Sequence, residues 1–197
     1  MHDWTGFFAG LQAGHGTGDS SWIDDPRFGG ASLGSHDIQG PTVGAQVGYN
    51  WQMDRWVFGA EADASWADLS GNHVDQFASD LHTTVKALGT ITGRVGRAYG
   101  NHHIYLEGGG AWENVEYEDF FGVGMGCNGC TDTTRWGWVF GGGWEYAFMD
   151  NFSVKLEYNY ITYGNETFGF SGGIGGNFVQ TIEDTYHHFK VGVSYHF

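Results

Sequence analysis

The segment TRWGWVFGGGWEYAF, residues 134–148, decides the fold because its large rings return at alternate positions. An extended chain places successive side chains on opposite faces. One face would carry Trp136, Trp138, Phe140, Trp144, Tyr146 and Phe148, and the other Arg135, Gly137, Val139, Gly141, Gly143 and Glu145. This period of two residues predicts a β-strand. A water-soluble sheet does not leave such a row of rings exposed, so the ring-bearing face requires an apolar environment.

The same alternation occurs in seven further segments, at 4–15, 42–52, 55–68, 82–99, 103–117 and 151–164 and in the last residues up to Phe197. Short polar stretches of the kind that close hairpins separate some of them, at 52–55, 100–101 and 149–151. The other connections are long and polar, at roughly 17–38, 70–80, 119–133 and 165–183. This order predicts an all-β fold, an eight-stranded antiparallel up-and-down transmembrane β-barrel forming one domain over residues 1–197.

The composition fits this prediction and excludes other classes of protein. The chain has 35 Gly, which disfavours helices, and no apolar run long enough for a transmembrane helix. A formal net charge of −15 argues against nucleic acid as a partner. Aromatic residues gather at both water–lipid interfaces of membrane proteins. The predicted order of strands and turns places Trp51 and Trp56 at the short-turn end of the barrel and Trp66 and Trp136 toward the other end. A soluble lipocalin-like barrel is the alternative, but its aromatic rings would then point inward, and the interior of an eight-stranded barrel is too small to hold so many of them.

Several stretches together resemble a known family. They are residues 4–14 (WTGFFAGLQAG), 48–52 (GYNWQ), 57–63 (VFGAEAD), 88–90 (LGT), 93–96 (GRVG), 141–148 (GGGWEYAF), 154–158 (VKLEY) and 191–197 (VGVSYHF). The chain resembles the small outer-membrane β-barrel proteins of alpha-proteobacteria, often labelled "porin family", which have an OmpA-like transmembrane barrel. The resemblance extends over all eight predicted strands.

The resemblance implies a bacterial outer-membrane location, with outer-membrane lipid and lipopolysaccharide as surroundings. It also implies export with a cleaved signal peptide and recognition of the C-terminal Phe197 by the barrel-assembly machinery. Met1 and His2 stand directly before the first predicted strand. We therefore interpret the chain as a mature form without a signal peptide.

The predicted inward faces carry many charges. They are Glu61, Asp63, Glu107, Glu113, Glu145 and Glu157 with Lys86, Arg94, Arg135, Lys155 and Lys190. An eight-stranded barrel has room inside only for side chains or one small ligand, and buried charges must be paired. We expect a polar network that plugs the lumen, with Glu145 or Glu157 paired to Arg94 or Lys86. A narrow, porin-like solute channel along the same residues is the alternative.

Cys127 and Cys130 form a CxxC motif within the third long connection. A zinc site would need a second pair of ligands, and thioredoxin-like chemistry would need a helix N-terminus. An Asn-Gly turn between the two cysteines and an oxidising compartment favour a small disulfide that staples the loop.

The ten His residues and the acidic loops raise the question of a metal or haem site. Neutral imidazole and carboxylate together suit divalent transition metals. Barrel closure would bring His15 near His187, with His188 beside it, so these three are the candidates. A solvated acidic rim is the simpler interpretation, and divalent cations such as calcium could bind the same carboxylates.

No pattern predicts an enzyme or a bound cofactor. A GxSxG motif is absent, and the Gly-rich stretch 169–176 lacks the strand–helix context of a phosphate loop. The sequence therefore predicts a non-enzymatic outer-membrane protein with a structural or surface-interaction role. The alternative functions are a narrow solute channel and a loop-based metal-binding or haem-binding surface protein.

Overall fold

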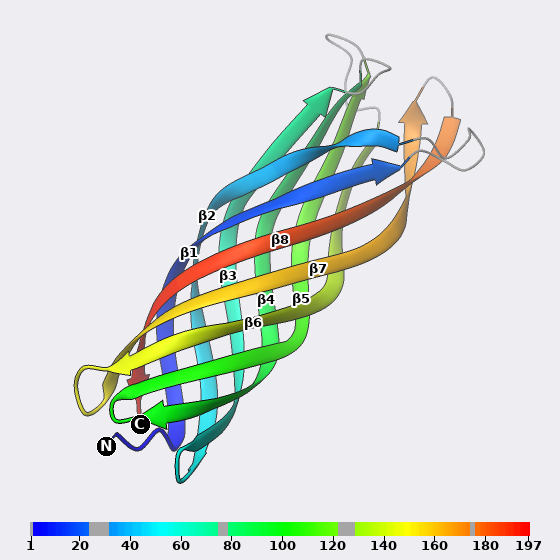
Figure 1. The fold of residues 1–197 in the computed structure, drawn as a ribbon. Helices are drawn as coiled ribbons and strands as arrows, with labels where there is room; N and C mark the ends of the chain where they lie inside the picture. Colours follow the sequence, from blue (N-terminus) through cyan, green and yellow to red (C-terminus); the bar gives the residue numbers. More distant parts are fainter. Residues whose placement is uncertain (1, 24–31, 75–78, 122–128, 174–175) are drawn as a thin grey trace.

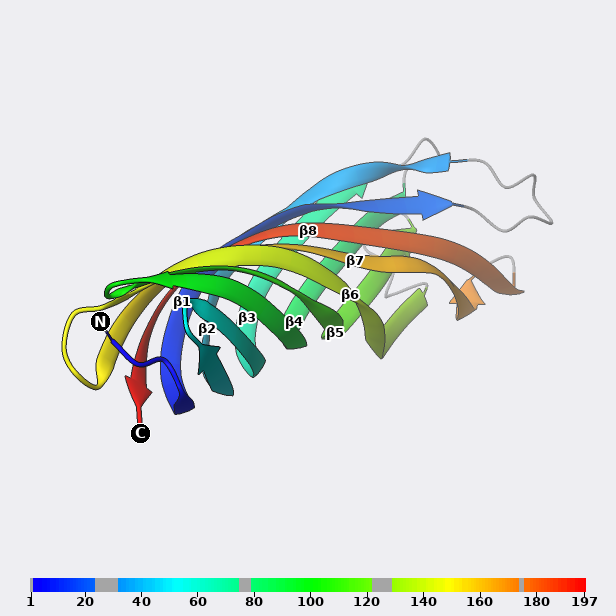
Figure 2. The ribbon, with the colours of Figure 1, turned by 60° about the horizontal axis from the view of Figure 1, so that its bottom comes forward.

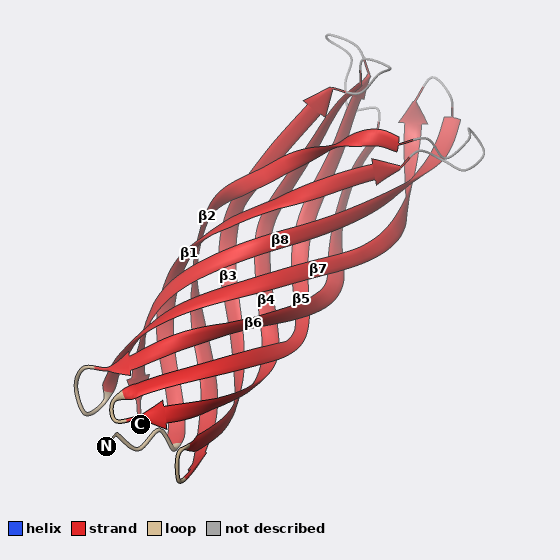
Figure 3. Ribbon diagram, viewed as in Figure 1, coloured by secondary structure: helices blue, strands red, loops and turns tan. Residues whose placement is uncertain are grey.

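The computed structural model describes residues 2–23, 32–74, 79–121, 129–173 and 176–197, and the described chain is built from strands and turns (Figures 1 and 3). The eight strands are β1 (Gly6–Ile23), β2 (Ser32–Met53), β3 (Trp56–Val74), β4 (Ser79–Tyr99), β5 (His102–Phe121), β6 (Gly129–Ala147), β7 (Phe152–Gly173) and β8 (Gly176–His196). Among these residues, no helix is long and apolar enough to cross a membrane.

The strands close into a single antiparallel barrel in chain order, which confirms the predicted fold. Each strand pairs with the next, and β1 returns to β8 with Phe8 opposite His196 and Ile23 opposite Thr181. Between the short hairpins and Trp138, closure leaves no open sheet edge among the described strands. The three short hairpins and both termini lie at one end, as Figures 1 and 2 show.

The strands are longer than the alternation of apolar residues predicted. Residues 17–38 were expected to form a connection, but β1 continues to Ile23 and β2 starts at Ser32, with Thr17 paired to Gln39. Strand also replaces most of the segments expected as connections at 70–80, 119–133 and 165–183. The expected long loops are therefore largely barrel wall.

Two aromatic belts surround the outside of the barrel. Trp56 and Trp66 lie ten residues apart on the outer face of β3, and Trp136 and Tyr146 are similarly spaced on β6. At about 3.3 Å per residue and a strand tilt of about 40°, this spacing spans roughly 25 Å, the height of the apolar band of a membrane barrel. The outer face between the belts is apolar and exposed, with Leu11, Val47, Phe58, Ile91, Leu106, Phe140, Leu156 and Val191 among its residues.

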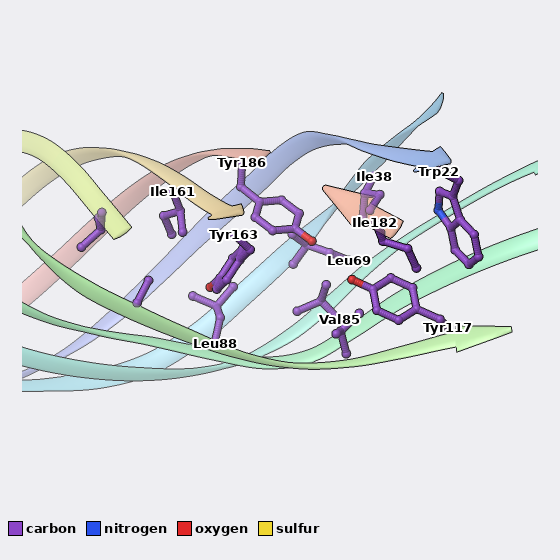
Figure 4. Close-up of a cluster of buried hydrophobic side chains, with 13 residues drawn as sticks. Trp22, Ile38, Leu69, Val85, Leu88, Tyr117, Ile161, Tyr163, Ile182 and Tyr186 are labelled. Atoms are coloured by element: carbon purple, nitrogen blue, oxygen red, sulfur yellow. The ribbon is translucent and has the colours of Figure 1, made fainter. Parts of the chain in front are cut away.

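The polarity of the barrel inverts above the belt that contains Trp66. Between the belts the apolar side chains point outward, whereas above Trp66 they point inward. The upper apolar layer, as we call it, consists of Trp22, Ile38, Leu69, Val85, Leu88, Ala111, Val115, Tyr117, Val139, Ile161, Tyr163, Ile182 and Tyr186 (Figure 4). Its outer face carries exposed polar residues such as Asp19, Asp37 and Asp68. This part of the barrel is thus built like a water-soluble protein.

Two β-bulges lie close to this inversion. The β3–β4 register shifts between Trp66 and Leu69, and the β4–β5 register shifts between Val85 and Ala87. Lys86 is therefore an additional residue on β4, and the bulge reverses the inward–outward phase of the strand. The prediction that Lys86 points into the lumen is wrong: its side chain is 51% exposed and pairs with Glu116 at 2.6 Å on the outside.

Candidate functional site

The interior between the belts holds a network of buried charges, which we call the polar layer. It consists of Glu61, Asp63, Arg94, Glu107, Lys155, Glu157 and Lys190, each less than a tenth exposed. The strands β3, β4, β5, β7 and β8 supply these residues because every second position faces inward.

Glu61 joins two cations in this layer. Its Oε1 lies 2.6 Å from Lys155 Nζ, and its Oε2 accepts a hydrogen bond of 2.8 Å from the Arg94 guanidinium. Arg94 also donates to Asn50 Oδ1 at 3.0 Å. The side chains of Glu61, Arg94 and Lys155 are at most 1% exposed, so their charges are compensated within the protein.

Glu157 and Asp63 balance the remaining cations. Glu157 accepts from Lys190, from Lys155 at 3.0 Å and from the Tyr105 hydroxyl at 2.7 Å. Asp63 lies 3.5 Å from Lys190 and also accepts from Thr90 and Gln12. Three carboxylates therefore meet three cations in one connected set.

Two predicted members of the network lie outside this connected set of ion pairs. Glu107 accepts only a 3.4 Å hydrogen bond from Thr92, and the described residues offer it no cation within 4.0 Å. Glu145 lies toward the short-hairpin end, where it accepts from Ser153 at 2.5 Å and lies 3.3 Å from His196. The expected pairing of Glu145 or Glu157 with Arg94 or Lys86 is not what the structure contains, since Arg94 pairs with Glu61.

Phe8 points inward and is 1% exposed. Its ring lies 4.4 Å from the Arg94 guanidinium carbon, and the ring of Tyr105 lies 5.0 Å away from the same atom. Aromatic faces attract a buried cation. Phe8 therefore packs against the one Arg of the polar layer and fills the space beside it.

A second charged site lies within the upper apolar layer, centred on Arg135 of β6. The guanidinium pairs with Asp184 and donates to the Tyr117 hydroxyl at 2.6 Å. It also donates to the backbone carbonyls of Gly164 at 2.9 Å and Ile182 at 3.1 Å. Arg135 thus connects β6 with β7 and β8 from inside the barrel.

The hydrogen bonds of Arg135 lie where the backbone hydrogen-bond ladder between β6 and β7 is incomplete. The β6–β7 pairing ends at Trp138 opposite Thr162, whereas the β5–β6 pairing continues to Gly129. The β7–β8 register also shifts between Tyr163 and Glu166. In the described strands, Arg135 therefore supplies side-chain hydrogen bonds where backbone pairing between β6 and β7 has stopped.

The short-hairpin end holds a buried apolar cluster that the sequence did not predict, and we call it the lower seal. Trp4, Val57, Ala98 and Ala147 form a buried apolar cluster. The ring of Trp4 lies 5.3 Å from that of His103 and 5.5 Å from that of His196, and its backbone N–H donates to Gln52. The alternation of residues carried no signal for this seal, because Trp4 precedes β1 and folds across the opening.

Closure does put His15 and His187 on neighbouring strands, as expected, but the three candidate metal ligands do not share one site. His188 points inward and lies 2.8 Å from Thr42 Oγ1, whereas His15 and His187 are exposed on the outer face. His187 lies beside Tyr158 in the aromatic belt, with Nδ1 2.7 Å from the hydroxyl. The described part of the chain contains no group of three or more potential ligands that could hold a metal ion. The predicted disulfide falls outside the described residues, since Cys127 lies in the segment 122–128.

A closed eight-stranded barrel with an apolar outer band, two aromatic belts and a charged interior defines the class of transmembrane barrels found in bacterial outer membranes. Residues 2–197 match the family model for the outer membrane protein beta-barrel domain, and the chain belongs to this family. It is an outer-membrane protein, and its apolar band lies in the lipid. The predicted family and location are confirmed.

The names of similar proteins also place them in the outer membrane. The chain is 31% identical to the 31 kDa outer-membrane immunogenic protein of Brucella melitensis biotype 1, over 98% of this chain and 84% of that protein. It is 26% identical to a 22 kDa outer membrane protein of Rhizobium leguminosarum, over 86% of this chain and 69% of that protein. Both organisms are alpha-proteobacteria, as the resemblance implied.

The fold is also found among solved structures. The outer membrane protein OprG of Pseudomonas aeruginosa superposes with a TM-score of 0.66 at 16% identity, and the match covers 100% of this chain and 98% of that one. At this identity the similarity establishes the barrel fold alone.

Proposed function

We propose that this protein is a non-conducting, non-enzymatic outer-membrane barrel that presents a surface for interactions outside the cell. The observation that carries the proposal is the filling of the interior at three successive levels. The lower seal around Trp4, the polar layer around Glu61 and the upper apolar layer around Tyr117 each consist of closely packed buried side chains. A pore requires continuous water, which such packing opposes.

The outer surface of the upper part supports the interaction role. Above the belt that contains Trp66, the wall carries exposed acidic residues including Asp19, Asp37 and Asp68. Several relatives, such as the Brucella 31 kDa and 25 kDa outer-membrane immunogenic proteins, are named as proteins that provoke an immune response. A protein of this kind presents part of its surface to the outside.

Planar lipid bilayers test the closed interior. The wild-type protein is expected to give no steady ionic current. Trp4→Gly and Tyr117→Gly together remove a ring from each end and are expected to produce intermittent current, whereas Trp136→Phe on the outer belt serves as the matched aromatic control and should stay silent. A steady current through the wild-type protein would overturn the proposal.

A second candidate function, passage of a small solute along a gated path, is favoured by one observation. The β6–β7 ladder stops at Trp138, and Arg135 spans the strands above it. If these strands separate, the Arg135→Gln variant gains current while Trp136→Phe does not. Current from Arg135→Gln together with a silent wild type would identify a closed channel rather than a permanent plug.

We further propose that the terminal residue serves assembly. Phe197 is 75% exposed, and its backbone N–H donates to the Phe7 carbonyl at 3.0 Å, which fixes the end of β8 beside β1. An exposed aromatic end suits recognition by the barrel-assembly machinery. Deletion of Phe197 should lower the folded fraction in cells and leave detergent refolding unchanged.

Divalent cations are proposed as partners of the acidic outer surface, because carboxylate oxygens suit calcium. Calcium is then expected to increase the binding of purified lipopolysaccharide to the folded protein. A response to calcium that equals the response to the same ionic strength of NaCl would reject this part of the proposal.

A further inference from the structure

A groove of about 710 Å³ opens on the outer face at the short-hairpin end of β2, β3 and β4. Its lining consists of Met53, Asp54, Trp56, Phe58 and Val95. Short turns of membrane barrels face the periplasm, so this groove meets the periplasmic leaflet of the outer membrane. Its walls are apolar except at Asp54.

A cation stands beside the groove. Arg97 is opposite Trp56 in the β3–β4 register and is exposed on the outer face. Its guanidinium carbon lies 5.2 Å from the ring of Trp56 and 5.8 Å from the ring of Tyr99. These two rings hold the guanidinium at the level of the periplasmic aromatic belt. Arg55, also exposed, immediately precedes Trp56.

The charge of Arg97 and Arg55 is available to a ligand. The chain has 8 Lys and Arg residues, of which seven are described and one, Arg27, lies outside the described residues. Arg94, Arg135, Lys155 and Lys190 are buried in the interior, and Lys86 pairs with Glu116. Within the described chain, Arg55 and Arg97 have no carboxylate within 4.0 Å. A protein with a net charge of −15 therefore places two uncompensated cations at one point of the periplasmic rim.

Asp54 is held in position at the mouth of the groove. Its φ of 56° lies in the left-handed region, which Asp tolerates better than most residues. The Gln52 side-chain amide donates to the Asp54 carbonyl at 2.8 Å, which fixes the turn. The Asp54 carboxylate likewise has no ion-pair partner among the described residues.

We propose that the groove binds a membrane phospholipid whose headgroup carries a primary ammonium. The phosphate is bound by Arg97, with Arg55 beside it, because guanidinium and phosphate form strong charge-assisted hydrogen bonds. One acyl chain lies along Trp56, Phe58 and Val95. The ammonium donates to the Asp54 carboxylate, so a headgroup with only negative charge is repelled at that point.

Native mass spectrometry of the folded protein, released from mixed micelles, tests the site. The probes are phosphatidylethanolamine, phosphatidylglycerol and phosphatidylcholine, offered in pairs at equal concentration. The wild-type protein is expected to retain phosphatidylethanolamine preferentially. Arg97→Gln should weaken retention of all three phospholipids roughly tenfold, since it removes a charged hydrogen-bond donor. Lys86→Gln, which removes an exposed cation far along the same strand, is the matched control and should retain lipid as the wild type does.

Asp54→Asn separates headgroup selection from phosphate binding, and Asn also tolerates the left-handed backbone. This variant should keep its phospholipid but lose the preference for phosphatidylethanolamine over phosphatidylglycerol. Equal losses in Arg97→Gln and Lys86→Gln, or an unchanged preference in Asp54→Asn, would overturn the proposal. Displacement of the lipid by millimolar inorganic phosphate or glycerophosphoethanolamine alone would also overturn it, because the acyl chain would then contribute nothing. Far-UV circular dichroism confirms that each variant is folded.

Discussion

Glu61 is the residue whose loss should affect the interior most, because two cations depend on it. Glu61→Gln leaves Arg94 without its carboxylate partner and removes one of the carboxylates that pair with Lys155. Removal of one member of a buried ion pair costs about 3–5 kcal/mol. Urea unfolding in lipid vesicles, followed by Trp fluorescence, should therefore show a large loss of stability.

The control for this prediction is Glu116→Gln, which breaks the exposed pair with Lys86. Water screens an exposed pair, so stability should change little. Equal midpoints of unfolding for the two variants would mean that burial of the polar layer contributes nothing to stability.

Gly48 provides a second test at a single position. A Cβ at this glycine would clash with Cζ of Phe8 and would lie 2.5 Å from the Ala60 carbonyl oxygen. Gly48→Ala is expected to destabilise the barrel by about 1–3 kcal/mol, the range for an overpacked core. Gly93→Ala is the control, because a Cβ there would meet nothing within 4 Å. The same urea midpoints distinguish the two substitutions, and equal effects would contradict the packing described for Phe8.

The direction of most interior side chains could be predicted from alternation, as Arg94, Lys155 and Lys190 illustrate. Lys86 could not, because a bulge of one residue leaves no mark in the composition of β4 and yet reverses its phase. The ion-pair partner of each charged residue could not be predicted from the sequence either. Arg94 pairs with Glu61 of the neighbouring strand rather than Glu145 or Glu157, and the stagger of the strands, which decides this, is not encoded in any one of them.

The upper halves of β6 and β7 differ from the other strand pairs and should differ in dynamics. Above Trp138 the described β6 residues pair with β5 on one side only. Amide hydrogens that lack a ladder partner exchange faster. Hydrogen exchange should be faster in a peptide from residues 129–137 than in one from residues 139–147, and equal protection would show that the ladder continues.

Arg135→Gln should extend this difference to β7. The guanidinium donates to the Gly164 and Ile182 carbonyls, so its loss frees the strand segment around Tyr163. Faster exchange is expected in residues 161–167, with residues 152–158 unchanged as the internal reference. Uniformly faster exchange in both segments would indicate general destabilisation instead of a local connection.

The number and order of the strands could be predicted from the sequence, whereas their upper limits could not. The prediction relied on apolar residues facing outward, and this pattern stops near Trp66. Beyond it the inward positions become apolar, as with Leu69 on β3 and Ile38 on β2, and on β4 a bulge at Lys86 also reverses the inward–outward phase. A change of polarity, joined on β4 by a change of phase, looks like the end of a strand in the sequence.

The whole molecule should require an apolar solvent to fold. Its outer band exposes large rings such as Trp66, Trp138 and Phe140, which are 76%, 75% and 64% exposed. In detergent the protein should give a β-rich circular dichroism spectrum and a band on a gel that shifts when the sample is boiled. A monodisperse, folded protein in plain buffer would contradict the outward placement of these rings.

The barrel wall continues above the upper aromatic belt, and this continuation determines how far the protein projects from the membrane. β3 extends eight residues beyond Trp66, to Val74, which at about 3.3 Å per residue and a tilt of about 40° raises the strand end roughly 20 Å above the lipid boundary. The barrel wall thereby projects to a fixed height beyond the lipid. Under the proposed interaction role, a partner that approaches from outside the cell would reach this wall before it reached the lipid, so the height of the wall, as well as its chemistry, would decide which partners can make contact.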